Sequence, residues 1–281
     1  MNKKQFFSHY PIRKKDSNKF DNGRVLFISG SRGMAGAAIL NIIGARSTGA
    51  SYIHSLLPES IYPIVATNEI TAVYHVDECS DKNYLKKSNL TEKIDSIALG
   101  SGLNNHPFAK EYLKESLKAE VPVVVDAYGL RLFADDKNLY KKINTVIMTP
   151  HLGEFSALCN MSVAQIQKDR ENIAVNFAKE NKVILVLKGP GTLVVSPAGQ
   201  VYKNNSGNEA LARAGSGDVL TGMIAGLCAL YDDPYTATTD AVWLHGHLCD
   251  EMIRTHSKEI FDLRDYPKAA DTFFYKRNVS K

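Results

Sequence analysis

The segment Gly215-Ser-Gly-Asp-Val-Leu-Thr-Gly-Met-Ile-Ala-Gly-Leu227 joins a loop of small residues to an apolar helical pattern, with a carboxylate at the junction. Apolar residues recur at helical spacing from Val219 to Leu227, which predicts a helix that begins at or beside Asp218. The first turn of a helix has unpaired N–H groups and a partial positive charge, and glycines before it let backbone approach an anion. An acid there would repel phosphate unless it had another use, such as accepting a proton from a hydroxyl that attacks the phosphate. This interpretation favours phosphoryl transfer.

The alternative is that Asp218 is only a helix cap. Asp is a favoured N-cap residue, and such a cap stabilises a helix by about 1 kcal/mol. These residues alone do not separate capping from phosphoryl chemistry, so other segments have to decide.

Short apolar runs alternate with helical patterns along the chain, which is typical of a layered sheet with crossover helices. Strands are expected at 25–29, 51–56, 94–99, 121–125, 145–148 and 183–187, and helices at about 37–47, 162–181, 218–231 and 236–256. Residues 192–196 and 200–203 flank Pro197-Ala-Gly199 and predict a β-hairpin. We therefore predict an α/β fold: a mostly parallel central sheet, helices on both faces and a β-hairpin at one edge.

Five polar or glycine-rich turns follow predicted strands, at residues 30–36, 100–103, 126, 149–154 and 188–192. Ligands of such sheets bind beyond the carboxyl ends of the strands, so these turns are expected to share one rim. Lys188-Gly-Pro-Gly-Thr192 supplies a cation and flexible backbone for a phosphate, although a tight turn with a surface lysine is the alternative. The spacing is not that of a P-loop, and the turn at 30–36 lacks the dinucleotide-binding spacing.

Two further groups of side chains could carry function. His151 and Glu154 lie three residues apart at an expected helix start, where they could bind substrate and, through water, Mg²⁺. The alternative is that Glu154 is a helix N-terminal acid and His151 a loop residue. His245 and His247 are interpreted as core or helix-face histidines, not as metal ligands.

Composition narrows the class of protein. The chain has 281 residues, 44% of them hydrophobic, and a net charge of +4, which gives no indication of nucleic acid but is compatible with an anionic substrate. The four cysteines have no paired spacing, and no apolar stretch is long enough for a signal or membrane segment, so we expect a cytoplasmic protein with free thiols and no membrane partner. Residues 1–22 predict a solvated basic leader, the tail after Asp271 is interpreted in the same way, and residues 23–281 predict one catalytic domain.

With these turns in order, the chain resembles the ADP/ATP-dependent NAD(P)H-hydrate dehydratases of the stand-alone bacterial type. The resemblance extends from about Gly23 to about Glu251 and is densest in residues 149–154, 188–192 and 208–220. It implies a three-layer ribokinase-like fold and a repair activity on hydrated NADH or NADPH. In that activity the ring hydroxyl is phosphorylated by ADP (or ATP), phosphate then leaves, and NAD(P)H, AMP and phosphate result. Mg²⁺ and a homotetramer are implied in the same way.

The resemblance also implies residue roles. Asp218 is similar to the catalytic residue that receives the hydroxyl proton. The positions similar to those that contact the hydrated cofactor are Ala37, Gly102, His151 and Asp218. The positions similar to those that bind nucleotide are Lys188, Gly189, Pro190, Gly191, Thr192, Gly215, Ser216 and Gly217.

The chain departs from the family pattern at several positions. Asp126-Ala-Tyr-Gly-Leu130 stands where the family usually has Asp-Ala-Asp-Ala-Leu, and Gly100-Ser-Gly-Leu-Asn104 where it has Gly-Pro-Gly-Leu-Gly. Leu152 replaces a proline, and Ala214 a glycine. These changes affect the nicotinamide side more than the nucleotide side. A small-molecule kinase for a vitamin or sugar alcohol, and a nucleotide-binding regulator without catalysis, are therefore the alternatives.

Overall fold

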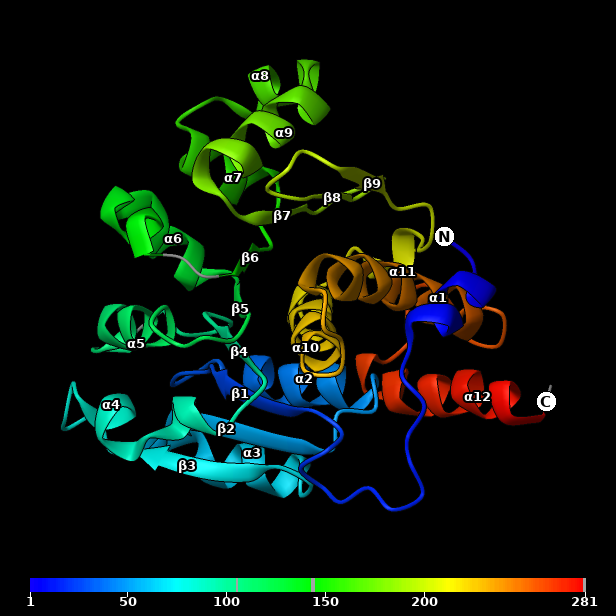
Figure 1. Cartoon of the computed structure of the whole chain (residues 1–281), viewed down its shortest axis with the longest axis horizontal. Helices are drawn as coiled ribbons and strands as arrows, with labels where there is room; N and C mark the ends of the chain where they lie inside the picture. The colour runs from blue at the N-terminus through cyan, green and yellow to red at the C-terminus, as the bar shows by residue number, and fades with distance from the viewer. Residues whose placement is uncertain (105, 143–144, 280–281) are drawn as a thin grey trace.

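Seven parallel strands form the centre of the molecule, and two antiparallel strands extend it at one edge (Figure 1). The computed structural model describes residues 1–104, 106–142 and 145–279. The strand order is β3-β2-β1-β4-β5-β6-β7-β8-β9. The strands are β1 (Arg24–Ile28), β2 (Tyr52–Pro58), β3 (Val73–Asp77), β4 (Ser96–Leu99), β5 (Val123–Val125), β6 (Val146–Met148), β7 (Ile184–Leu187), β8 (Leu193–Val195) and β9 (Val201–Lys203). The mostly parallel sheet and the edge hairpin are thus confirmed.

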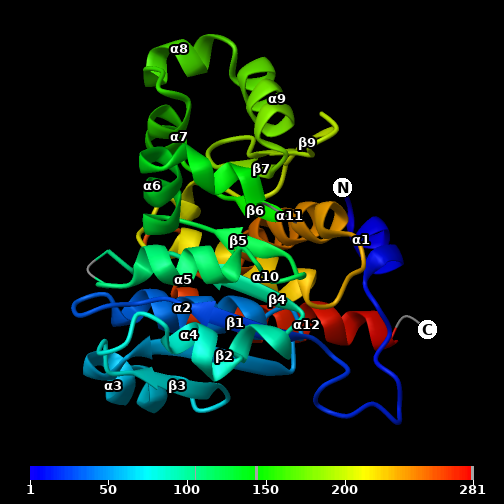
Figure 2. The same ribbon diagram turned by 60° about the vertical axis from the view of Figure 1, so that its left-hand side comes forward.

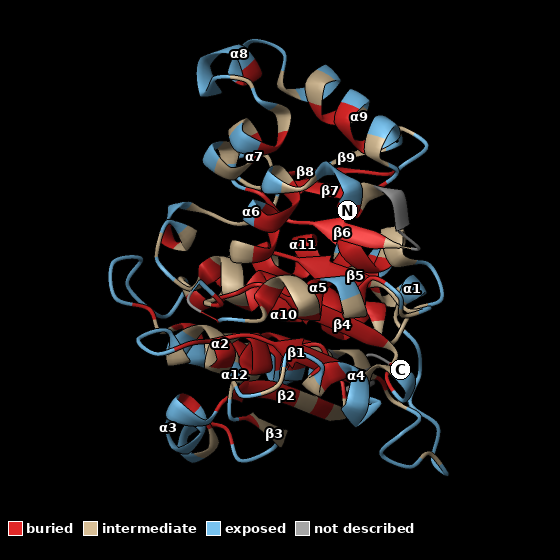
Figure 3. Ribbon diagram, turned by 90° about the vertical axis from the view of Figure 1, so that its left-hand side faces the viewer, coloured by how far each residue is buried: buried red, intermediate tan, exposed pale blue. Residues whose placement is uncertain are grey.

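Helices cover both faces of the sheet, which gives three layers (Figures 2 and 3). The central strands are apolar at nearly every position because both of their faces are buried. One face is covered by α2 (Ala35–Arg46), α3 (Tyr62–Asn68), α10 (Ser216–Cys228), α11 (Pro234–Met252) and α12 (Tyr266–Val279). The other is covered by α4 (Tyr84–Ser88), α5 (Ala109–Ser116), α6 (Tyr128–Asp135), α7 (Leu152–Cys159), α8 (Val163–Lys168) and α9 (Arg170–Asn181). Short 3₁₀ turns lie at Glu59–Ile61, Leu90–Glu92, Lys137–Lys142, Glu209–Leu211 and Leu263–Asp265.

The helix predicted over 162–181 is wrong in one respect, because it is two helices. Ser162 caps α8 through a capping box with Gln165, but Asp169 has φ −145° and interrupts the helical backbone. The interruption lets Arg170 begin α9 and donate hydrogen bonds to the carbonyls of Leu187 and Pro190. The segment therefore braces the turn after β7 instead of forming one continuous helix.

The two ends of the chain differ from the solvated segments that their charge indicates. Residues Lys3–His9 form the helix α1, and its Phe6 is fully buried against Trp243 and Phe273. The Nδ1 atom of His9 lies 3.1 Å from a carboxylate oxygen of the buried Asp240. Basic residues give both ends their net charge, but a few aromatic side chains decide the packing. Among the described residues, no helix combines the length and apolar character needed to cross a bilayer.

Helices α2 and α10 are in direct backbone contact. A Cβ atom on Gly44 would lie 2.2 Å from the carbonyl oxygen of Val219, and one on Gly222 would lie 2.1 Å from that of Asn41. Such distances leave no room for any side chain, so glycine is required at both positions by close approach. The contact fixes α10 against α2 and thereby fixes the first turn of α10.

We expect Gly44→Ala to destabilise the protein by about 1–3 kcal/mol, because the added methyl group forces the two helices apart. Gly36→Ala, also in α2, is the matched control, since a Cβ there would meet nothing within 4 Å. The free energy of unfolding, measured in urea for both variants, checks this. Equal stability of the two variants would contradict the backbone contact.

Candidate active site

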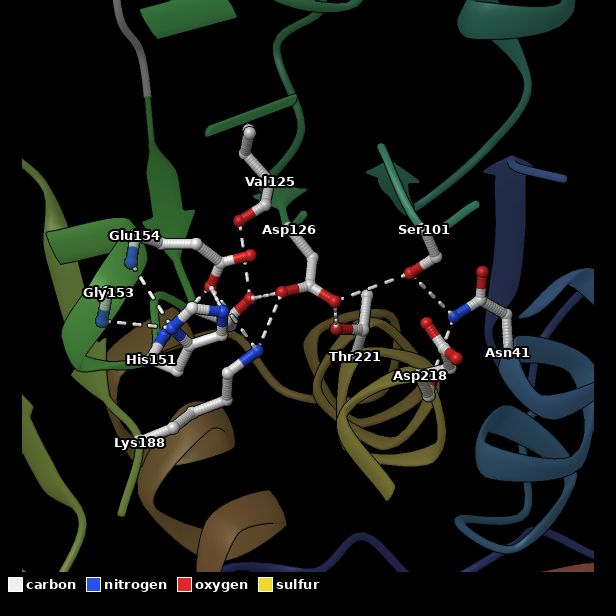
Figure 4. Close-up of polar contacts among 11 residues, drawn as sticks. Asn41, Ser101, Val125, Asp126, His151, Gly153, Glu154, Lys188, Asp218 and Thr221 are labelled. Atoms are coloured by element: carbon white, nitrogen blue, oxygen red, sulfur yellow. Dashed lines mark hydrogen bonds and ion pairs between the residues drawn. The ribbon is translucent and has the colours of Figure 1, made fainter. Parts of the chain in front are cut away.

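The first turn of α10 lies at the carboxyl ends of the central strands and presents Asp218 there (Figure 4). The helix begins at Ser216, and Gly215, with φ +92°, is the N-cap residue. Asp218 therefore lies inside the first turn and is not the cap, so the capping interpretation does not apply to it. The amide of Asn41 donates a 2.9 Å hydrogen bond to the Asp218 carbonyl and ties this turn to α2.

The Asp218 carboxylate is half-buried and has an altered proton affinity. Burial raises the pKa of Asp218 to about 6, and the negative charge of Asp126 acts in the same direction. A hydrogen bond from Ser101 and the charge of Lys188 oppose this shift. A carboxylate with this pKa is ionised at neutral pH and is a stronger base than an exposed aspartate.

A second carboxylate, Asp126, follows β5 and is 2% exposed. Its Oδ1 atom lies 2.9 Å from the Lys188 ammonium and accepts a 2.8 Å hydrogen bond from the Thr149 hydroxyl. Its Oδ2 atom accepts a 3.0 Å hydrogen bond from the Thr221 hydroxyl. Burial opposes ionisation, but the Lys188 charge and these donors hold the pKa of Asp126 below its usual value. Asp126 is thus a permanent anion inside the site.

Lys188 joins the turn after β7 to the first turn of α10. A Cβ atom on Gly217 would lie 3.3 Å from the Lys188 ammonium, so this cation faces the N-terminus of the helix. The ammonium also lies 4.0 Å from Glu154. Arg170 holds the rest of the turn by donating hydrogen bonds to the carbonyls of Pro190 and Gly191, at 2.9 and 3.3 Å. Gly189 and Pro190 are exposed at the rim of the site.

The residues expected on the substrate side fall into two places. Ala37 and Gly102 are adjacent, since a Cβ on Gly102 would lie 2.7 Å from the Ala37 Cβ. His151 lies apart from them, on the Glu154 side of Asp126 in Figure 4. It forms a capping box with Glu154 at the start of α7, in which the His151 side chain accepts the Glu154 N–H and the Glu154 carboxylate accepts the His151 N–H. Both residues thus cap a helix, and the His151 side chain remains 61% exposed.

Several residues of the site have no role assigned from the sequence. Asp126 and Thr149 are placed on the shared rim because they follow predicted strands, but the sequence does not indicate their contacts. Asn41 and Thr221 lie within apolar helices and meet their partners only through the tertiary fold. Arg170 gave no signal. His245 is buried and stacks on Tyr266, in agreement with a core histidine.

A separate group, formed by Asp77, Cys79 and His106, lies at the end of β3 and has the composition of a metal site. The hydrogen bonds do not favour one. The Nδ1 atom of His106 accepts the Phe108 N–H at 3.1 Å, so the proton is on Nε2, which lies 2.9 Å from an Asp77 oxygen. A metal would need the lone pair of that nitrogen. Tyr112 donates to the same carboxylate at 2.7 Å, and the group anchors α5 to β3.

Comparison with known proteins gives the family. A family model described as NAD(P)H-hydrate dehydratase matches residues 25–265. The ADP-dependent (S)-NAD(P)H-hydrate dehydratase of Bacillus subtilis is 34% identical over 248 residues, which are 88% of this chain and 87% of that protein. A bifunctional NAD(P)H-hydrate repair enzyme of Moorella thermoacetica is 36% identical over 272 residues; the match covers 92% of this chain but only 51% of that enzyme.

Solved structures agree with this. The ADP/ATP-dependent NAD(P)H-hydrate dehydratase from Bacillus subtilis, co-crystallised with ATP and Mg²⁺, superposes with a TM-score of 0.88 at 30% identity, over 98% of this chain and 97% of that one. A ribokinase-like superfamily protein from Enterococcus faecalis superposes with a TM-score of 0.85 at 25% identity, over 98% and 95% of the two chains. The ribokinase-like fold is therefore confirmed, and the chain belongs to the NAD(P)H-hydrate dehydratase family.

Proposed function

We propose that this protein dehydrates the 6-hydroxy form of NADH or NADPH at the expense of ADP, and so returns a damaged cofactor to use. The observation that carries the proposal is Asp218 in the first turn of α10, with the Lys188 ammonium directed at the same turn. A base and an anion site are thereby adjacent. This is the arrangement that transfer of a phosphoryl group to a hydroxyl requires.

In the proposed reaction, Asp218 accepts the proton of the ring hydroxyl while the hydroxyl oxygen attacks the terminal phosphorus of ADP. The bond from that phosphorus to its bridging oxygen breaks, and AMP leaves. Hydroxide is a poor leaving group, but the phosphate ester formed is a good one. Its C–O bond then breaks with loss of a proton from the neighbouring ring carbon, and the reduced nicotinamide is restored together with phosphate.

The N–H groups at Gly215, Ser216 and Gly217 are proposed to bind the transferred phosphoryl group, with Lys188 as the nearby cation. The turn Gly189-Pro-Gly-Thr192 is proposed to bind the rest of the nucleotide. Ala37, Gly102 and His151 are proposed to contact the hydrated cofactor. The ADP dependence stated for the Bacillus subtilis relative supports ADP as the donor.

Glu154 is the residue proposed to hold Mg²⁺, through water. Mg²⁺ usually keeps several waters and takes one or two carboxylates together with substrate phosphates. The Glu154 carboxylate fits that role because it is only 17% exposed and lies 4.0 Å from the ammonium expected at the phosphates. When bound, the ion would neutralise charge on the phosphates. The cytoplasmic location and the homotetramer stay predictions.

The central experiment mixes hydrated NADH, ADP and Mg²⁺ with the protein and follows the absorbance band of reduced nicotinamide. We expect recovery of this band with release of AMP and phosphate, and a loss of roughly 10²–10⁴-fold in kcat for Asp218→Asn with ADP binding retained. Asp135→Asn, an exposed acid of α6, is the control. A stable phosphorylated product without free phosphate would instead identify a kinase, and full activity of Asp218→Asn would remove the base.

The pH dependence follows from the raised pKa of Asp218. Because the base must be ionised to accept a proton, kcat/KM is expected to rise as pH increases through about 6 and to level off above it. Circular dichroism over the same range excludes unfolding as the cause. A kcat/KM that is constant between about pH 5 and 7 would contradict the assignment.

Lys188→Met should weaken ADP binding, because the ammonium near the N-terminus of α10 is lost and Asp126 is left as an uncompensated buried anion. We expect the dissociation constant for ADP, measured by calorimetry, to rise about tenfold or more. Lys114→Met, an exposed lysine of α5, is the control. Equal affinities of the two variants would contradict a nucleotide site at the turn after β7.

A further inference from the structure

Asp126 is the most completely surrounded charge of the site, and the proposed reaction assigns it no step. Its donors come from three different places: Thr149 from the turn after β6, Lys188 from the turn after β7, and Thr221 from α10. The Ser101 hydroxyl, from the turn after β4, lies 3.4 Å from its Oδ2 atom. Asp126 therefore connects four neighbouring strand ends to the helix that carries the base.

A buried carboxylate is a costly choice if it serves only to hold the fold. Ion pairs in the interior often contribute little net stability, and apolar residues of similar volume can replace them without loss. The Asp126–Lys188 ion pair instead fixes a position. Its 2.9 Å contact holds the Lys188 ammonium beside the first turn of α10, close to Gly217. Without Asp126, a lysine side chain with four rotatable bonds would be free to turn toward Asp218 or Glu154.

We propose that Asp126 is a positioning residue for the phosphoryl transfer: it fixes the Lys188 ammonium at the N-terminus of α10 and keeps that cation away from the Asp218 carboxylate. The proposal rests on the proposed function, since it concerns the same reaction. Asp126 touches no reacting atom and acts through Lys188 and through its own charge. Figure 4 shows Asp126 between Lys188 and Ser101, with Asp218 below Ser101, on the side of Asp126 away from Lys188.

The charges that face Asp218 support this division of roles. They are Asp126 from the end of β5, Lys188 from the end of β7 and Glu154 from α7, while Ser101 donates a hydrogen bond. His245, from α11, is buried with its pKa lowered to about 4, so it is neutral where Asp218 titrates. Asp126 and Ser101 act on Asp218 in opposite senses, because one repels its negative charge and the other stabilises it. Removing each group must therefore shift the titration of Asp218 in opposite directions.

The test follows the carboxyl carbon of Asp218 by NMR in ¹³C-labelled protein without substrate. In Asp126→Asn we expect the midpoint of Asp218 to fall by about one pH unit, since a nearby negative charge is lost and Lys188 is released. In Ser101→Ala the midpoint should rise. Asp240→Asn, which alters another fully buried carboxylate, is the matched control; Asp240 pairs with His9 and is not among the groups that shift Asp218, so the midpoint should stay unchanged.

Activity supplies the second measurement. In Asp126→Asn the loss should appear mainly in kcat, about tenfold or more, with a smaller change in the KM for ADP, because the lysine remains but is misplaced. The acid limb of kcat/KM should move to lower pH together with the NMR midpoint. A purely structural role would lower stability but leave kcat at saturating ADP unchanged in the folded variant, and that result would overturn the proposal.

If Asp126→Asn does not fold, the same NMR titration of the wild-type protein tests the proposal. A sequentially assigned Asp126 resonance that is constant from about pH 5 to 8, while Asp218 titrates, supports the proposal; an Asp126 that titrates in that range overturns it. The NMR midpoints need no turnover. Opposite midpoint shifts in a protein that acts on no hydrated cofactor would therefore contradict the proposed function alone.

Discussion

The direct contact between the backbones of α2 and α10 is the constraint on which the site depends. Two helices approach this closely only where side chains are absent, and Gly44 and Gly222 provide that. The contact brings Asn41 within hydrogen-bonding distance of the Asp218 carbonyl. Asn41 lies three residues before Gly44 on α2, and Asp218 lies four residues before Gly222 on α10. The packing of the two helices therefore sets the position of the base. A loop could not hold a base with the same accuracy.

The two aspartates of the site, Asp126 and Asp218, lie in different environments. Asp126 is paired with a cation and with hydroxyl donors, which keep its charge, whereas Asp218 is half-buried without a cation of its own. Two carboxylates whose surroundings separate their pKa values can serve in different roles in one site. The division depends on which strand end carries which residue. Ser101, Asp126, Thr149 and Lys188 come from turns after four neighbouring parallel strands, so the sheet itself arranges the charges.

The sequence predicted much of the fold because the buried parallel strands are continuous apolar runs. β3 is not predicted, since Val73–Asp77 is an edge strand that is only half-buried at its first four positions, and His75 interrupts its apolar residues. The start of α10 was placed two residues late, because Gly215 rather than Asp218 is the N-cap. The strand-end turns predicted one shared rim, but not which side chains contact one another across it. Thr221 and Asp126 are 95 residues apart in the sequence, and no local pattern indicates that they form a hydrogen bond. The roles of individual residues follow from the resemblance to the dehydratase family. The spacing of the motifs alone indicates phosphoryl transfer but does not identify a substrate.

The docking of α1 onto α12 makes one part of the core depend on residues that are far apart in the order of synthesis. Phe6 is buried partly by Phe273, which is added to the chain only after all the strands from β1 to β9 have been synthesised. α1 therefore leaves the ribosome long before its binding surface is complete. The aromatic side chains of α1 can reach their buried positions only after the sheet has been translated, so this contact forms late in the assembly of the fold.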